Sequence, residues 1–263
     1  RDKQRKHKNE EETKNYGLKD KVVVISGGTS GIGLATARLA VADGARVFLI
    51  GRSEENGLSA LGILDADPEM VKFIQADVST IDGCQSAAEA VNKAAGRVDI
   101  LVNSAGVYRE QWLELVTEDE YQEIMDINVK GTLFLCQVML PLMTEHGSTI
   151  INIASDAGLE GNYGCPVYCA SKGAVVALTR ALALDYAPRI RVNCVCPGDV
   201  ATPLVEKQLA AGDYTLEEMA EPYPIGRIGQ PEEIAHVICS LASPFNSYMT
   251  GSIVPVDGGL TAK

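Results

Sequence analysis

The sequence is poor in aromatic residues, histidine and basic residues. Aromatic residues make up 5% of 263 positions, and the three histidines are scattered at positions 7, 146 and 236. So few dispersed histidines suit neither a metal site nor a Ser-His-Asp triad. With 23 Lys and Arg against 35 Asp and Glu, the net charge is -12. We therefore expect no metal and no nucleic-acid partner, because binding to a phosphate backbone needs clustered basic residues.

Long apolar runs and paired cysteine motifs are also missing. No stretch approaches the roughly 18 consecutive apolar residues of a membrane span, and the N-terminus lacks the apolar core of a secretory signal. The seven cysteines are odd in number, without CxxC spacing. We expect buried free thiols rather than a disulfide framework. These absences predict a cytoplasmic protein with no membrane partner.

The chain divides into a charged N-terminal extension, residues 1–17, and a catalytic domain, residues 18–263. The first fifteen residues form a basic block followed by an acidic block and cannot build a core. They are expected to be a solvated tail, or a helix lying on the body or on a partner subunit. The whole chain is 46% hydrophobic, which is enough for a sizeable core in the catalytic domain.

Short β-branched runs alternate with stretches of helical periodicity along the domain, which is typical of βαβ units. The predicted strands are 22–26, 46–50, 71–76, 99–103, 149–154, 190–195 and 252–256. The predicted helices are 31–43, 80–95, 118–144, 166–187 and 231–242. Near-continuous apolar strands indicate burial on both faces. The fold class is therefore α/β, with a doubly wound, parallel, seven-stranded sheet flanked by helices.

A glycine-rich turn follows the first predicted strand. Its expected cofactor-binding residues are Gly27, Thr29, Ser30, Gly31, Ile32 and Gly33. Glycines permit a tight turn and close approach of the backbone, and the helix that follows presents free N–H groups to a pyrophosphate. The turn predicts a dinucleotide cofactor.

Arg52 and Ser53 stand at the end of the second strand, where folds that select NAD place an acidic residue. A guanidinium can hold the 2′-phosphate of NADP, which an acid would repel. NADP(H) is therefore favoured over NAD(H). The alternative is that Arg52 is an ordinary surface residue and NAD binds through backbone and hydroxyl donors.

Tyr168 and Lys172 are separated by four positions on a predicted helix, which places them on one face. A nearby ammonium favours phenolate, so Lys172 is expected to lower the pKa of Tyr168. Such a tyrosine can exchange a proton with an alcohol or a ketone. Ser155, at the end of the fifth strand, can donate to the same substrate oxygen.

The glycine turn, Tyr168 with Lys172, and Ser155 at its spacing together resemble the short-chain dehydrogenases/reductases, a family of NAD(P)-dependent enzymes with a single-domain Rossmann fold. The resemblance covers residues 18 to 261, with Ser26 in place of the family's Thr. It implies that Asn128 completes the catalytic set as part of a proton relay. It also implies cofactor contacts by the residues Asp77, Val78, Asn103, Ala105, Gly106, Tyr168, Lys172, Pro197, Gly198, Val200 and Thr202. Asp77 is open to a second interpretation, as a helix N-cap.

The resemblance further implies a homotetramer and a substrate lid at about residues 199–224. Leu204, Leu209, Tyr214, Leu216 and Met219 are apolar residues of this lid. They favour a lipophilic ketone or a hydroxysteroid as the small-molecule substrate, unless they simply pack on the body.

Three alternatives stay open. The first is a 3-oxoacyl-carrier-protein reductase, for which the lid offers only Lys207 as a basic contact for an acidic partner. The second is enoyl reduction, but Cys165 stands where those relatives place a tyrosine. The third is a non-catalytic cofactor-binding or regulatory protein, although such relatives lose Ser, Tyr or Lys and this chain keeps all three.

Overall fold

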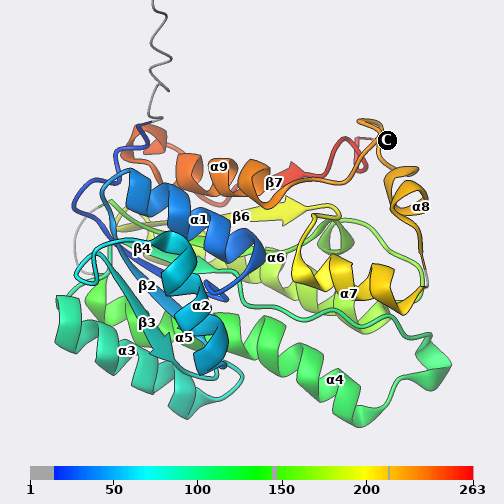
Figure 1. Cartoon of the computed structure of the whole chain (residues 1–263), viewed down its shortest axis with the longest axis horizontal. Helices are drawn as coiled ribbons and strands as arrows, with labels where there is room; N and C mark the ends of the chain where they lie inside the picture. Colours follow the sequence, from blue (N-terminus) through cyan, green and yellow to red (C-terminus); the bar gives the residue numbers. More distant parts are fainter. Residues whose placement is uncertain (1–14, 144–146, 213, 263) are drawn as a thin grey trace, which may run out of the picture.

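A parallel sheet organises the computed structural model, which describes residues 15–143, 147–212 and 214–262 (Figure 1). Its strands within these ranges are β1 (Val22–Ser26), β2 (Arg46–Gly51), β3 (Val71–Gln75), β4 (Ile100–Asn103), β5 (Ser148–Ile153), β6 (Ile190–Pro197) and β7 (Ile253–Val256). The strand order is β3-β2-β1-β4-β5-β6-β7, with every neighbouring pair parallel. The predicted seven-stranded, doubly wound sheet is confirmed.

Helices cover both faces of the sheet (Figure 1). They are α1 (Gly31–Ala42), α2 (Glu54–Leu64), α3 (Ile81–Ala95), α4 (Glu118–Met125), α5 (Gly131–Met139), α6 (Pro166–Tyr186), α7 (Pro203–Ala211), α8 (Leu216–Ala220) and α9 (Pro231–Ala242). Helices α1, α2 and α9 contribute to one apolar core, and α3, α5 and α6 contribute to the other. Because the strands are buried on both faces, they carry apolar residues at consecutive positions.

The sequence analysis missed helix α2. Ser53 caps it by accepting a hydrogen bond from the Asn56 N–H, and Glu54 and Glu55 occupy the first turn. Its apolar periodicity is broken at Gly57, where a Cβ would lie 2.4 Å from the Phe73 ring. The glycine is needed for packing against β3, and it hides the helical pattern.

The predicted helix 118–144 is also interrupted. It consists of α4, a π-helical segment Asp126–Lys130, and α5, which ends at Met139. The predicted lid, at about residues 199–224, contains α7 and α8, the latter opened by a capping box between Thr215 and Glu218. The helix considered for residues 1–15 lies outside the described residues, Asn15 excepted.

Arg191, on β6, fastens the last part of the chain to the sheet. Its guanidinium is 7% exposed and donates hydrogen bonds to the carbonyl oxygens of Leu241, Ala242, Ser243 and Met249. These carbonyls belong to the C-terminal end of α9 and the turn before β7. The charge is therefore compensated by several acceptors, as a buried guanidinium requires.

All seven cysteines are free, as expected, and Cys169 alone among them is half-buried rather than buried. Helix α6 is long and apolar enough to cross a membrane by length and composition. Core helices pass the same test, and α6 packs against β6.

Candidate active site

A cavity of about 440 Å³ opens at the carboxyl ends of β1, β4, β5 and β6. Ligands of open α/β sheets bind at this edge, at the point where the strand order reverses. The order here reverses between β1 and β4. The predicted site residues that line the cavity are Gly27, Ser30, Gly31, Ile32, Ala105, Gly106, Ser155, Tyr168, Lys172, Pro197, Gly198, Val200 and Thr202.

The turn between β1 and α1 can be built only with glycine at two positions. Gly27 has φ +66°, and a Cβ there would lie 2.8 Å from the Ala105 backbone. At Gly33 a Cβ would lie 2.3 Å from the Gly27 carbonyl oxygen. The turn therefore packs backbone against backbone, which leaves a shallow cradle for a phosphate group.

The helix N-terminus beside this cradle keeps its positive character. Ser30 is the N-cap of α1, but its side chain makes no capping hydrogen bond, and the first turn has no acidic residue. Thr202, the N-cap of α7, likewise makes no capping bond, and its side chain lies next to Gly31. Two hydroxyls and a helix N-terminus are thus available to a dinucleotide, and these residues fit the predicted cofactor.

The other predicted cofactor residues lie outside the cavity lining. Arg52 is exposed at the end of β2, and its carbonyl accepts from the Gln75 side chain. Asp77 accepts from the Ser79 N–H, whereas the N-cap of α3 is Thr80. The alternative N-cap interpretation of Asp77 is therefore wrong. The cofactor contacts of Thr29, Gly33, Arg52, Ser53, Asp77, Val78 and Asn103 stay predictions.

Asn103 has a structural role that the sequence analysis did not foresee. Its amide donates to Asn152 Oδ1 at 2.8 Å and to Cys136 Sγ at 3.2 Å, which joins β4 to β5 and α5. Its own Oδ1 is buried without a hydrogen-bond partner among the described residues. The side chain therefore positions the strand ends that form the floor of the cavity.

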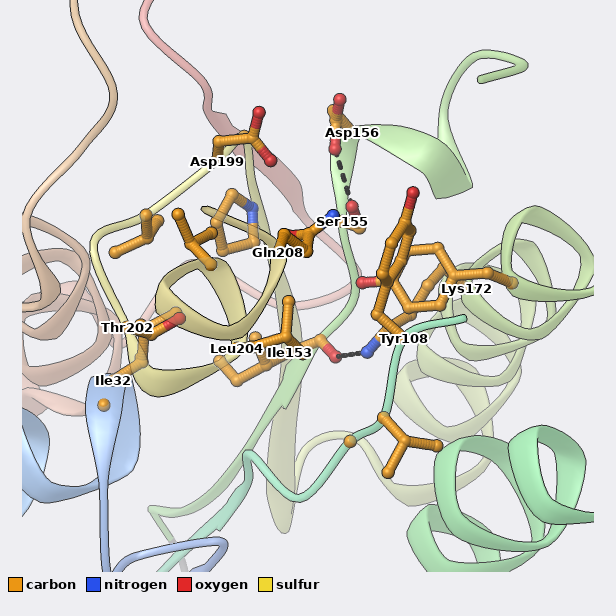
Figure 2. A pocket seen from close by; sticks show the side chains of 18 of the residues that line it. Ile32, Tyr108, Ile153, Ser155, Asp156, Lys172, Asp199, Thr202, Leu204 and Gln208 are labelled. Atoms are coloured by element: carbon orange, nitrogen blue, oxygen red, sulfur yellow. Dashed lines mark hydrogen bonds between the residues drawn. The ribbon is translucent and has the colours of Figure 1, made fainter. Parts of the chain in front are cut away.

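Helix α6 delivers Tyr168 and Lys172 to the cavity wall. The Lys172 ammonium donates to the Ile153 carbonyl oxygen at 3.1 Å (Figure 2). It lies 5.6 Å from the centroid of the Tyr168 ring. Burial lowers the pKa of Lys172 to about 8, because a low-dielectric site disfavours the ammonium form. The edge of the Tyr108 ring packs on the Tyr168 ring at 4.9 Å between centroids.

The pKa of Tyr168 is raised overall, whereas the sequence analysis expected the nearby Lys172 to lower it. Burial raises the pKa of Tyr168, the hydrogen bond with Ser155 lowers it, and the nearby Asp156 and Asp199 raise it further. The net result is a pKa above the ordinary value for tyrosine. The sequence analysis considered the ammonium but overlooked the burial of Tyr168 and the two carboxylates. A raised pKa keeps the phenol protonated, as a proton donor must be.

Asn128 is held in the π-helical segment between α4 and α5. Its side-chain amide donates to the Val107 carbonyl and to Ser171 Oγ, both at 3.0 Å, and its Oδ1 accepts from the Val107 N–H. Ser171 in turn donates to the Tyr168 carbonyl at 2.7 Å. A Cβ on Gly106 would lie 3.4 Å from both Asn128 Oδ1 and Lys172 Nζ. Asn128 therefore stands beside the lysine, as the relay predicts, at the kind of irregular helix often found in functional sites.

Four acidic residues in the cavity lining were missed. Asp156 directly follows Ser155, and Asp199 directly follows Gly198; Glu110 and Glu218 lie further out. Glu110 accepts hydrogen bonds from Tyr214, at 2.8 Å, and from Tyr108, at 3.3 Å. The sequence did contain a signal for two of them, because Asp156 and Asp199 each directly follow a predicted site residue in an apolar stretch. Trp112, on the segment after β4, is 55% exposed and does not line the cavity.

A phosphate-binding turn and a Ser-Tyr-Lys group that share one cavity define a nicotinamide-dependent oxidoreductase. The family described as enoyl-(acyl carrier protein) reductase matches residues 27–261. The chain belongs to the short-chain dehydrogenase/reductase family. It is an enzyme of the kind that acts on CH–OH groups with NAD or NADP. Cys165 still stands where enoyl reductases were expected to carry a tyrosine.

Named relatives cover nearly the whole chain. A 3-oxoacyl-[acyl-carrier-protein] reductase FabG of Thermotoga maritima is 37% identical and covers 92% of this chain and 98% of its own. A 3beta-hydroxysteroid dehydrogenase of Mediterraneibacter gnavus is 32% identical, with 92% and 95% covered. The crystal structure titled short-chain dehydrogenase/reductase SDR:glucose/ribitol dehydrogenase, from Brucella melitensis, has a TM-score of 0.88, 34% identity, and 94% and 98% covered.

Proposed function

We propose that this enzyme interconverts a lipophilic ketone, of the hydroxysteroid class, and its secondary alcohol, with NADP(H) preferred over NAD(H). The observation that carries the proposal is that Ser155, Tyr168 and Lys172 line the same cavity as the glycine turn. The cavity is large enough for the nicotinamide end of a cofactor beside a substrate. Its substrate side includes Leu204 and Met219.

Tyr168 is the proton donor in the proposed ketone reduction. When bound, the nicotinamide supplies or accepts the hydride. The Tyr168 phenol donates a proton to the substrate oxygen, and its raised pKa suits this direction at neutral pH. The Ser155 hydroxyl donates to Asp156 Oδ1 at 2.6 Å in the structure; in the proposed reaction it rotates and donates to the substrate oxygen instead. Lys172 and Asn128 return the proton to Tyr168.

The lid supports a lipophilic substrate through some of the predicted residues only. Leu204, Tyr214 and Met219 line the cavity, whereas Leu209 packs in a small core and Leu216 is exposed without lining it. Met219 also belongs to that core. Fewer apolar residues of the lid therefore line the cavity than the composition of residues 199–224 indicates.

The 3-oxoacyl-carrier-protein reductase stays as the alternative, supported by the Thermotoga relative. An acidic carrier protein would need a basic surface at the cavity mouth. Lys207 is the only basic residue between positions 197 and 226. The lid thus favours a free small molecule over a carrier-bound one.

A substrate panel tests the proposed function. Purified enzyme is mixed with NADPH or NADH and with ketosteroids, cyclic ketones or an acetoacetyl thioester, and absorbance at the nicotinamide band is followed. We expect oxidation of NADPH with the ketosteroids or cyclic ketones. Activity confined to the thioester would contradict the proposal and favour the alternative.

The cofactor preference has its own test in Arg52. Replacing Arg52 with Ala should raise KM for NADPH by about 10-fold and leave KM for NADH nearly unchanged, because a charge-assisted contact to the 2′-phosphate is lost. Arg38→Ala is the matched control, since Arg38 is exposed on α1 and pairs with Glu232. Equal effects on both cofactors would contradict the assignment.

Exposed apolar side chains support the proposed homotetramer. Leu133 on α5 is 39% exposed and Leu184 on α6 is 83% exposed, while Phe245 and Tyr248 project near β7. The resemblance to the family implies that the predicted helices at 118–144 and 166–187 form one interface and the region of the last strand another, and these side chains lie in those two regions. We also retain the expectation of a cytoplasmic protein and of a lid at about residues 199–224.

A further inference from the structure

Two carboxylates stand beside the reacting groups and have no place in the proposed proton transfer. Asp156 begins the 3-10 helix that follows β5, and Asp199 follows the end of β6. Both line the cavity, and Figure 2 shows them at the same end of it, with Asp156 hydrogen-bonded to Ser155. Asp156 is only 6% exposed.

Neither carboxylate is neutralised by a cation. No ion pair of the described residues includes Asp156 or Asp199. Asp156 accepts from Ser155 Oγ at 2.6 Å and from the Asn162 amide at 3.3 Å. Asp199 is partly buried and interacts with the Tyr223 hydroxyl. The Lys172 ammonium is directed at the Ile153 carbonyl instead.

The two carboxylates act on each other and on the catalytic tyrosine. Burial raises the pKa of Asp199, its hydrogen bond with Tyr223 lowers it, and Asp156 raises it again. Both carboxylates raise the pKa of Tyr168. Their charges therefore act at the position of the reacting atoms. Each carboxylate has hydrogen-bond donors from the chain but no cation, so a further donor from a ligand would stabilise its charge in the cavity.

The position of Asp156 relative to Ser155 indicates which part of a substrate would meet it. A substrate oxygen held by Ser155 Oγ lies next to Asp156, because the Ser155 and Asp156 oxygens are 2.6 Å apart. A group on the carbon adjacent to the reacting carbon would reach the same region. A carboxylate only accepts hydrogen bonds, so it selects a donor at that position.

We propose that Asp156 and Asp199 are specificity-determining residues that bind a hydroxyl group on the carbon adjacent to the reacting carbon. This inference rests on the proposed function and narrows it to α-hydroxy ketones and vicinal diols, carried on a body that can contact Leu204 and Met219. It also separates the enzyme from the carrier-protein alternative. A 3-oxoacyl thioester presents a carbonyl acceptor near the reacting ketone, and the carboxylates would repel it.

The first experiment compares substrates that differ only in the donor. Cyclohexanol, 1,2-cyclohexanediol and 2-methoxycyclohexanol are oxidised with NADP, and kcat/KM is measured for each. The methyl ether keeps the oxygen and removes its proton. We expect the diol to exceed the ether by about 10- to 100-fold, the range for a hydrogen bond to a charged group. Equal values for the diol and the ether would overturn the inference.

The second experiment removes each charge. Asp199→Asn and Asp156→Asn should each reduce the ratio of kcat/KM for the diol to that for cyclohexanol by about 10-fold. Asp185→Asn, at an exposed position on α6, is the matched control and should leave the ratio unchanged. An unaltered ratio in a folded Asp199→Asn enzyme overturns the inference, whether or not Asp156→Asn folds.

The two proposals fail in different ways. If the enzyme oxidises none of the three alcohols and reduces no ketone of the panel, the proposed function is wrong. If kcat/KM for cyclohexanol equals that for the diol, and the Asp156 and Asp199 variants show the same ratio as the Asp185→Asn control, the proposed function stands and the role of the two carboxylates is wrong. A further compound, 2-aminocyclohexanol, distinguishes donors: preference for its ammonium over the diol's hydroxyl would overturn the hydroxyl assignment.

Discussion

Replacing Tyr168 with Phe should lower kcat for ketone reduction by about 1,000-fold, because the proton donor is lost and the ring is kept. Ring packing against Tyr108, at 4.9 Å between centroids, does not use the hydroxyl. Binding of NADPH, measured by fluorescence titration, should therefore change by no more than about fivefold, since a single uncharged hydrogen bond contributes about 1 kcal/mol or less. Steady-state rates with the preferred ketone provide the main measurement.

Tyr108→Phe is the matched control for this variant. The Tyr108 hydroxyl also lies at the cavity, but it donates to Glu110 at 3.3 Å and has no part in the proposed proton transfer. We expect it to keep most of the activity. A Tyr168→Phe enzyme with more than a tenth of the original kcat would show that another group supplies the proton.

Replacing Lys172 with Met should make the protein more stable and nearly inactive. Loss of the ammonium beside Tyr168 should lower kcat by at least about 100-fold. Burial lowers the pKa of Lys172 from 10.5 to about 8, which corresponds to about 3 kcal/mol of unfavourable free energy for the charged form. The Ile153 carbonyl loses its partner, at a cost of about 1 kcal/mol. The net gain is about 2 kcal/mol, measurable by urea unfolding at pH 7.

The pH dependence gives this prediction a second readout. The folded chain holds the lysine proton less tightly than the unfolded chain, so the destabilisation is fully present below about pH 8. It declines as the pH rises toward 10.5, where both states lose the proton. The difference in free energy of unfolding between the Lys172→Met variant and the native protein should therefore decrease between about pH 8 and pH 10.5. Lys207→Met, at an exposed position, should show no such trend, and a constant advantage would contradict the assigned burial cost.

Sequence reasoning found the parts of the site that lie in short continuous motifs. The glycine turn needs Gly27 and Gly33 for steric reasons that the structure shows directly, and Tyr168 and Lys172 share a helix face as their spacing indicates. The strands were predictable because their burial on both faces leaves apolar runs. In each of these cases local residues alone determine the geometry.

Features that depend on contacts between distant segments could not be predicted. Helix α2 was missed because Gly57 makes room for Phe73 of another element. The direction predicted for the pKa shift of Tyr168 was wrong because the side chain is buried and because Asp156 and Asp199 approach it from two different strand ends. Asp199 lies 31 positions from Tyr168 in the sequence, and no local pattern connects them.

The buried Arg191 bears on the order in which the ribosome makes this protein. Its carbonyl acceptors lie 50 to 58 residues further along the chain, so strand β6 leaves the ribosome long before they do. The nascent chain can assemble the first five strands into a sheet. The Arg191 guanidinium must nevertheless stay hydrated until the end of α9 has been translated. A polypeptide released before that point would carry the complete glycine turn and the tyrosine–lysine helix on a sheet with an open edge, the kind of edge that invites aggregation.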